Sequence, residues 1–207
     1  MFKANCYNIM VVSPGDITDE RKTAYNAVLD WNTINSERNG IVLNPIGWDI
    51  NLYPEMGTHP QNIINRQILE KADILIGIFW TRIGTPTKEH LSGSVEEITK
   101  HINANKPALL YFSSIAIKPA NIDNDQYQKL LAYKDSIKEM SYYKEYDSHE
   151  AFKRLIANDI QLLANDKLED FHADGYASEL NKQYSATKQM LLTLFRKYPR
   201  LEKTINY

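Results

Sequence analysis

Polar and aromatic residues that could bind or transform a ligand follow three apolar stretches of the sequence and begin the helix after the third. They are Ser13, Gly15 and Asp16; Trp48 and Asp49; Trp80, Thr81 and Arg82; and Ser94 and Glu97. If the apolar stretches are neighbouring parallel strands, their carboxyl ends meet at one edge of a sheet, where ligands bind in open α/β folds. We therefore expect these residues to line one crevice.

The residue types in this group suit a ligand that contains a flat base and a ribose. Tryptophan rings stack on bases, while hydroxyl and carboxyl groups hydrogen-bond to sugar hydroxyls. Cleavage of an N-glycosidic bond passes through an oxocarbenium-like state, which a carboxylate can stabilise or attack. We predict a nucleotide or nucleoside ligand, with Glu97 as the catalytic residue and the rest of the group as its binding site.

Several of these residues also have a purely structural interpretation. Ser94 and Glu97 have the S-x-x-E spacing of a capping box, in which the glutamate bonds back to the serine amide at a helix start. Glu96 would then be a solvated acid of the first turn, favoured by the helix dipole. Trp48 and Trp80 could be core residues, since large aromatic side chains are mostly buried. At this level both interpretations of Glu97 stay open.

Motifs for other chemistries are missing from the sequence. The five histidines show no H-x-x-x-H or C-x-x-C pairing, so we predict no metal site. The segment 84–87 is not a phosphate-binding P-loop, because the G-x-x-x-x-G-K-[ST] pattern is absent. Ser13 lacks the G-x-S-x-G context of a hydrolase nucleophile. These patterns leave the carboxylate of Glu97 as the strongest candidate for catalysis.

Five apolar stretches at 6–13, 41–48, 74–80, 108–112 and 142–146 alternate with amphipathic helical stretches. Short connections and this alternation predict an α/β fold, a doubly wound five-stranded parallel sheet with helices on both faces. With right-handed crossovers the strand order becomes 2-1-3-4-5, as in flavodoxin-like folds. Pro45 inside the second stretch predicts an edge strand, because proline cannot donate to a sheet ladder.

The sequence changes character after Leu163, where a polar and charged segment begins. We predict an α/β domain at 1–163 and a C-terminal helical appendage at 164–207. Apolar residues at helical spacing mark the extra helix; they are Ala177, Leu180, Tyr184, Leu191, Leu194 and Tyr198. This helix could pack on the sheet domain or mediate self-association with a second copy of the chain.

Charge and composition limit which binding partners and which cellular compartment we expect. The net charge of −2 argues against a nucleic-acid partner or a charged membrane surface. Cys6 is the single cysteine, which excludes an internal disulfide and favours a reducing compartment. No charged-then-apolar leader opens the sequence, and no apolar run reaches the roughly 18 residues that span a membrane. We expect a cytoplasmic location.

Two groups of motifs resemble known families. Residues 9–21 (IMVVSPGDITDER) look like the opening of a TIR-like domain family of unassigned function. Residues 72–79 (ADILIGIF), 93–97 (GSVEE) and 105–107 (NKP) are similar in order to motifs of the nucleoside 2-deoxyribosyltransferases. On that mapping Glu97 takes the place of the catalytic carboxylate, and TIR-type NAD hydrolases have a glutamate on the corresponding helix. Thr99, where the transferases usually have glycine, and the longer segment 84–91 depart from the transferase pattern.

The resemblance implies a TIR-like N-glycosidase that cleaves the nicotinamide–ribose bond of NAD by hydrolysis or cyclisation. NAD would be a substrate, and no cofactor is expected. The expected setting is bacterial antiphage defence, with self-association or a sensor or receptor protein as partner. One alternative is a nucleoside 2-deoxyribosyltransferase or nucleotide N-glycosidase. Another is a non-catalytic module for nucleotide binding or assembly.

Overall fold

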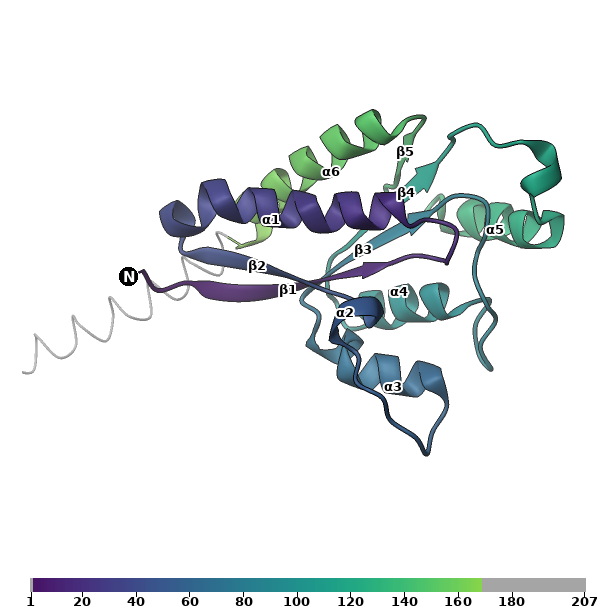
Figure 1. Ribbon diagram of the computed structural model, residues 1–207, viewed down its shortest axis with the longest axis horizontal. Helices are drawn as coiled ribbons and strands as arrows, with labels where there is room; N and C mark the ends of the chain where they lie inside the picture. Colours follow the sequence, from purple (N-terminus) through teal and green to yellow (C-terminus); the bar gives the residue numbers. More distant parts are fainter. Residues whose placement is uncertain (1, 169–207) are drawn as a thin grey trace, which may run out of the picture. The chain divides into compact units, whose positions relative to one another are not determined.

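The computed structural model describes residues 2–168, in which five strands alternate with helices (Figure 1). The elements in chain order are β1 Asn5–Val12, α1 Asp19–Asn39, β2 Ile41–Ile46, α2 Trp48–Asn51, α3 Pro60–Gln67, η1 Leu69–Lys71, β3 Ile74–Phe79, α4 Gly93–Asn103, β4 Ala108–Ser113, η2 Pro119–Asn121, α5 Asn124–Ile137, β5 Lys144–Tyr146, α6 His149–Leu163 and η3 Ala164–Leu168. The chain forms two compact units, Met1–Gln161 and Leu162–Tyr207. The helix predicted from residues 177 to 198 lies outside the described residues, and the division after residue 163 stays a prediction.

All five strands are parallel and lie in the order β2-β1-β3-β4-β5, which confirms the predicted topology. The central strand β3 is buried along its whole length, as its unbroken apolar sequence requires when helices cover both faces of a sheet. Pro45 lies in β2, an edge strand, where a missing backbone donor is tolerated. Gly40 ends α1 in the left-handed conformation (φ 62°), which returns the chain to the sheet.

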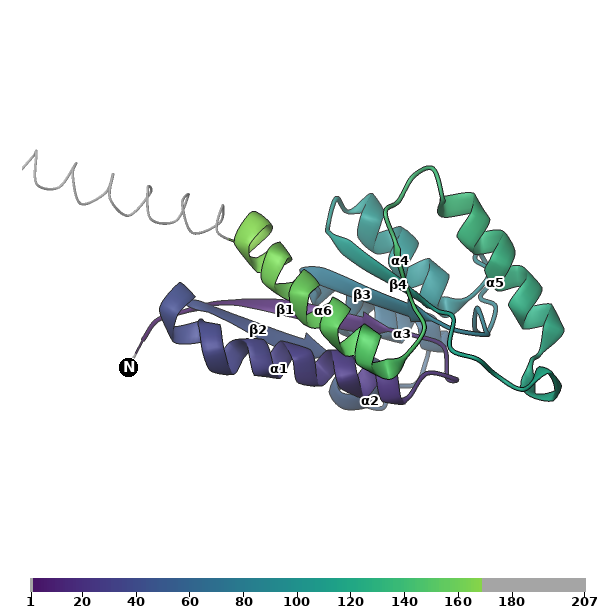
Figure 2. The same cartoon turned by 90° about the horizontal axis from the view of Figure 1, so that it is seen from above.

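Helices cover both faces of the sheet (Figures 1 and 2). On one face α1 and α6 lie side by side, joined by a hydrogen bond from Trp31 Nε1 to Gln161 Oε1 (3.0 Å). Trp31 is one of the buried residues of α1. On the other face α3, α4 and α5 pack against the sheet. In this arrangement, loops and the first turns of helices lie at the carboxyl ends of the strands.

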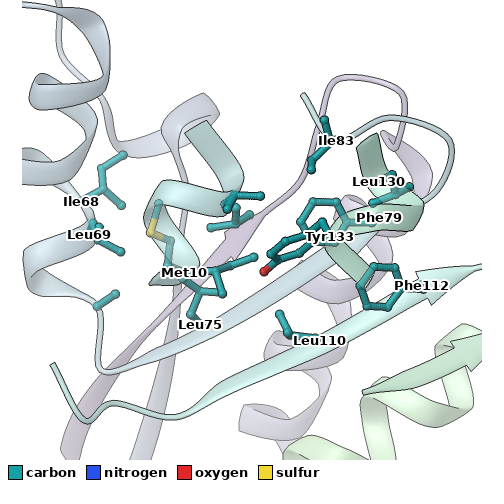
Figure 3. Packing of buried hydrophobic residues seen from close by; sticks show 14 of the residues in the cluster. Met10, Ile68, Leu69, Leu75, Phe79, Ile83, Leu110, Phe112, Leu130 and Tyr133 are labelled. Atoms are coloured by element: carbon teal, nitrogen blue, oxygen red, sulfur yellow. The ribbon is translucent and has the colours of Figure 1, made fainter. Parts of the chain in front are cut away.

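The core between the sheet and the second group of helices positions the start of α4. Figure 3 shows strand residues of this cluster, among them Leu75, Phe79 and Phe112, packed with side chains of the helices. Val95 and Ile98 anchor α4 in the same cluster. Because these two residues bury one stripe of α4, its first two turns are held at the carboxyl edge of β3.

The second predicted strand is shorter than expected. It ends at Ile46, and Trp48 begins the short helix α2 instead of closing the strand. Residues 49–51 form the rest of α2. The consequence is local, since the helical turn places Trp48 and Asp49 beside the carboxyl end of the sheet rather than within it.

Candidate functional site

A cavity of about 400 Å³ opens at the carboxyl edge of the sheet. Its walls come from the loop after β1, from α2 and α3, from the loop after β3, and from α4 and α5. The lining residues are Ser13, Pro14, Gly15, Trp48, Gln61, Ile64, Arg82, Gly84, Thr85, Gly93, Ser94, Glu97 and Gln126. Six of the residues predicted from the sequence therefore share one cavity: Ser13, Gly15, Trp48, Arg82, Ser94 and Glu97.

The structure does not bring the other predicted residues to this cavity. Trp80 donates a hydrogen bond from Nε1 to the carbonyl of Ile115 (2.9 Å) and, with Asp16, lines a separate hollow of about 280 Å³. Thr81 is buried and donates from its backbone N–H (3.2 Å) and its hydroxyl (2.8 Å) to Asp16 Oδ2. The prediction of a single crevice is therefore wrong for Asp16, Trp80 and Thr81. The contacts between Asp16 and Thr81 instead connect the loop after β1 to the end of β3.

Asp49 also lies outside the lining of the cavity, although its neighbour Trp48 belongs to it. The Asp49 carboxylate accepts a hydrogen bond from the Tyr25 hydroxyl (2.9 Å) and lies 3.6 Å from the guanidinium of Arg21. Burial, together with the negative charge and hydrogen bond of Asp49, raises the pKa of Tyr25. These contacts give Asp49 a structural role between α1 and α2.

Helix α4 begins earlier than the sequence pattern suggests. Its N-cap is Ser92, whose buried Oγ accepts a hydrogen bond from the backbone N–H of Val95 (3.2 Å). Ser94 is thus already inside the first turn, and Glu97 follows it into the second. The capping-box interpretation of Ser94 and Glu97 is wrong, because the cap lies two residues upstream and Glu97 turns toward α3 and the cavity.

Glu97 is a buried carboxylate that lines the cavity, with 5% of its surface exposed. Its Oε1 accepts a hydrogen bond from Gln61 Nε2 (2.8 Å), and no other hydrogen bond reaches this side chain from residues 2–168. Burial raises the pKa of Glu97 to about 7, against the lowering effect of Gln61 and with a further raising effect of the nearby Glu96 charge. At neutral pH this carboxyl can therefore both accept and donate a proton.

Glu96 differs from its neighbour, and the prediction that it is solvated is wrong. It is equally buried, at 5% exposure, but its Oε1 accepts hydrogen bonds from Asn65 Nδ2 (2.9 Å) and Lys100 Nζ (2.5 Å). Burial alone would raise its pKa, but the hydrogen bonds from Lys100, Thr87 and Asn65 outweigh burial and lower the pKa to about 2. Glu96 remains an anion across the physiological range.

Trp48 stands at the edge of the cavity with 43% of its surface exposed, so its interpretation as a core residue is wrong. The guanidinium of Arg21 lies over its ring, 5.0 Å from the centroid. Arg21 is itself buried and donates from Nε (3.0 Å) and Nη2 (2.9 Å) to Ser13 Oγ. One arginine of α1 thereby holds two residues of the cavity wall.

Arg82 brings a positive charge to the opposite wall. Half of its side chain is exposed, and it pairs with Asp123 at 3.2 Å. Exposed ion pairs of this kind are weak, so an anionic ligand can compete for the guanidinium. Gln126 supports the same wall, because its Oε1 accepts the backbone N–H of Gly84 (3.0 Å).

Sequence reasoning missed Gln61 and Arg21. Gln61 belongs to α3, and its contact with Glu97 spans 36 positions of the chain. The available signal was the polar pair Gln61 and Asn65, four residues apart on the side of a short buried helix. Arg21 ends the segment 9–21 that carried a resemblance, but its burial could not be read from composition.

Within the described part of the chain, no group of three or more histidine, cysteine, aspartate or glutamate residues is arranged to hold a metal ion. None of the helices in this part is long and apolar enough to cross a membrane.

Residues 8–161 match a protein family described as "Domain of unknown function (DUF4062)". No curated protein matches the chain. Among solved structures, translation elongation factor SelB from Methanococcus maripaludis in its apo form is 11% identical, with a TM-score of 0.43; the match covers 80% of this chain and 36% of that one. RosB with a bound riboflavin phosphate intermediate is 10% identical, with a TM-score of 0.32 and coverage of 84% and 87%.

Proposed function

The chain belongs to this domain family of unknown function, and from the chemistry of its cavity we propose that it cleaves an N-glycosidic bond of a nucleotide. The substrate we propose is NAD, and the bond is the one between nicotinamide and ribose. The observation that carries the proposal is Glu97, a buried carboxylate in a cavity at the carboxyl edge of the sheet, with a neutral amide as its hydrogen-bond donor.

The proposed reaction needs a negative charge beside the ribose. As the bond between C1′ and the pyridine nitrogen breaks, its electron pair leaves with nicotinamide, and positive charge develops on the ribosyl group. Ionised Glu97 stabilises this charge. Water then bonds to C1′ and releases one proton, which Glu97 can accept because its pKa is raised to about 7. In cyclisation, a nucleophilic atom of the same molecule would replace water.

Other residues of the cavity suit the remaining parts of such a ligand. Trp48 offers an exposed indole ring for stacking on a base, and Ser13 and Ser94 offer hydroxyl groups. Arg82 can meet a phosphate. The resemblance of residues 9–21 to TIR-like domains, and of residues 93–97 to the transferases, supports the same reaction class.

The test is incubation of the purified chain with NAD, with products separated by chromatography and identified by mass. Wild type should release nicotinamide, and Glu97→Gln should not, at low and at high protein concentration. Glu89→Gln is the matched control, because Glu89 is exposed and does not line the cavity. Unchanged nicotinamide release by Glu97→Gln would refute the role of Glu97.

Parallel incubations with deoxynucleosides distinguish the alternative enzyme. Free base from a deoxynucleoside, with NAD left intact, would favour a deoxyribosyltransferase or nucleotide N-glycosidase that uses the same carboxylate. No turnover of either substrate at any concentration would favour a binding or assembly module. Antiphage defence, cytoplasmic location and self-association stay predictions from the sequence.

A further inference from the structure

Two amide side chains of α3 face two carboxylates of α4. Gln61 Nε2 donates to Glu97 Oε1 (2.8 Å) and to Asn65 Oδ1 (3.3 Å). One turn further, Asn65 Nδ2 donates to Glu96 Oε1 (2.9 Å). All four side chains are buried, so these contacts are shielded from competing water. Helix α3 therefore supplies a hydrogen-bond donor to each of the two carboxylates.

The Gln61 amide lies close against the backbone of Gly93. A Cβ atom at Gly93 would lie 2.4 Å from Gln61 Oε1 and 3.3 Å from its Cδ. The amide oxygen thus occupies the space that a side chain at position 93 would need. Gly93 is the first residue of α4, so the Gln61 amide can take its present position against the start of the helix because this residue is glycine.

We infer that Gln61 is the positioning residue of the site: its amide, held between Gly93 and Asn65, orients the Glu97 carboxylate and donates to its ionised form. A catalytic consequence rests on the proposed function. The effect on the carboxylate itself can be measured without any substrate. Gln61 would act through Glu97 and is not proposed to touch the reacting bond.

The charged groups around Glu97 differ between the elements that surround it. Helix α3 presents the neutral Gln61 and Asn65 to α4. The ionisable groups near this site are Glu96 and Lys100 of α4, His59 at the start of α3, Arg82 on the cavity wall, and Arg21 behind Ser13. Glu96 raises the pKa of Glu97, and Gln61 lowers it. Loss of the Gln61 amide would consequently make the carboxylate harder to ionise.

The test compares Gln61→Met with Gln67→Met. Both glutamines are buried in α3, but Gln67 hydrogen-bonds to Tyr53 and Glu55, away from Glu97. The readout is the chemical shift of the Glu97 carboxyl carbon as a function of pH in protein labelled with ¹³C-glutamate. The signal is assigned by its absence in Glu97→Gln. We expect the midpoint of the Glu97 titration to lie at higher pH in Gln61→Met than in wild type, and to be unchanged in Gln67→Met.

Gly93→Ala is a second variant for the case in which Gln61→Met does not fold. Its added methyl group displaces the Gln61 amide and should raise the midpoint in the same direction. A midpoint equal to that of wild type in the folded variants would overturn the inference.

Where NAD is cleaved, the rate gives a second readout. The acid limb of the pH–rate profile should move to higher pH in Gln61→Met, with roughly five- to tenfold slower turnover at neutral pH and recovery in alkali. A merely structural role would lower the rate equally at all pH values, which would contradict positioning. A raised midpoint without NAD cleavage by wild type would reject the proposed function and leave the inference on Gln61 intact.

Discussion

Asp159 in α6 and Glu97 in α4 are buried carboxylates on opposite faces of the sheet, and their charges are compensated differently. Asp159 accepts a hydrogen bond from the Tyr111 hydroxyl (2.8 Å) and pairs with Lys144 Nζ (2.5 Å). Glu97 receives its hydrogen bond from a neutral amide, and the nearby charge of Glu96 has the same sign as its own. Both side chains are less than a tenth exposed.

The difference separates a structural carboxylate from a candidate catalytic one. A buried charge with a cation and a further donor is explained by its partners alone. Burial and the negative charge of Asp159 raise the pKa of Tyr111, which keeps that hydroxyl a donor. A buried carboxylate beside a like charge is unfavourable, and groups of this kind concentrate at functional sites. The cavity beside Glu97 gives such a group access to a ligand.

The largest difference between the two sites is expected when each carboxyl group is replaced by its amide. Glu97→Gln should lower nicotinamide release by at least ~10²–10³-fold while the protein stays folded, because it removes the charge that stabilises the ribosyl cation. Asp159→Asn should lower stability and leave the rate of the folded protein close to wild type. Rates by chromatography and melting curves of both variants check this. Similar activity losses in both would remove the distinction.

The pH dependence of stability tests the uncompensated charge directly. Glu97 has a pKa of about 7 in the fold, against an ordinary value of 4.5. Between these values the folded state binds more protons than the unfolded chain, so the free energy of unfolding falls as pH rises through this window. Relative to Glu97→Gln, wild type should lose up to about 3 kcal/mol between acid and mildly alkaline pH. Urea denaturation of both proteins across this range measures it; parallel curves would contradict the raised pKa.

Removal of the Lys144 cation should leave the buried charge of Asp159 less well compensated, as the charge of Glu97 already is. Lys144→Met leaves Asp159 with the Tyr111 hydroxyl and should lower the free energy of unfolding by about 2 kcal/mol, since Lys144 is partly exposed. Lys129→Met is the control, because its pair with Asp125 is exposed on one helix face and should matter little. Equal effects of the two variants in urea denaturation would argue against a compensating role of Lys144.

The smallest expected effect concerns the like charge beside Glu97. Glu96→Gln removes a negative charge that raises the pKa of Glu97, so the Glu97 midpoint should fall by under about one pH unit. The ¹³C titration described above measures this shift. A rise of the midpoint would mean that the Asn65 and Lys100 contacts of Glu96, rather than its charge, dominate its influence on Glu97.

The sequence by itself determined the sheet and the edge where the cavity lies. The alternation of apolar strands with helices, together with right-handed crossovers, leads to one strand order, and the structure has that order. This order alone predicts that the carboxyl ends of β1 and β3 meet, and no side-chain contact has to be known for that. Ser13, Gly15 and Arg82 could be placed at the cavity for this reason, as could the start of α4 with Ser94 and Glu97.

Only the tertiary structure decided which residues face the cavity and what surrounds Glu97. Phe79 belongs to the core under α4 and α5, so the next residue, Trp80, points to the other side of the sheet and lines a different hollow. Ser92 rather than Ser94 caps α4, which releases Glu97 from a capping role. Gln61 reaches Glu97 from a helix that precedes β3. Local patterns report spacing along one element, whereas the pKa of a buried carboxylate depends on contacts between elements that are distant in the chain.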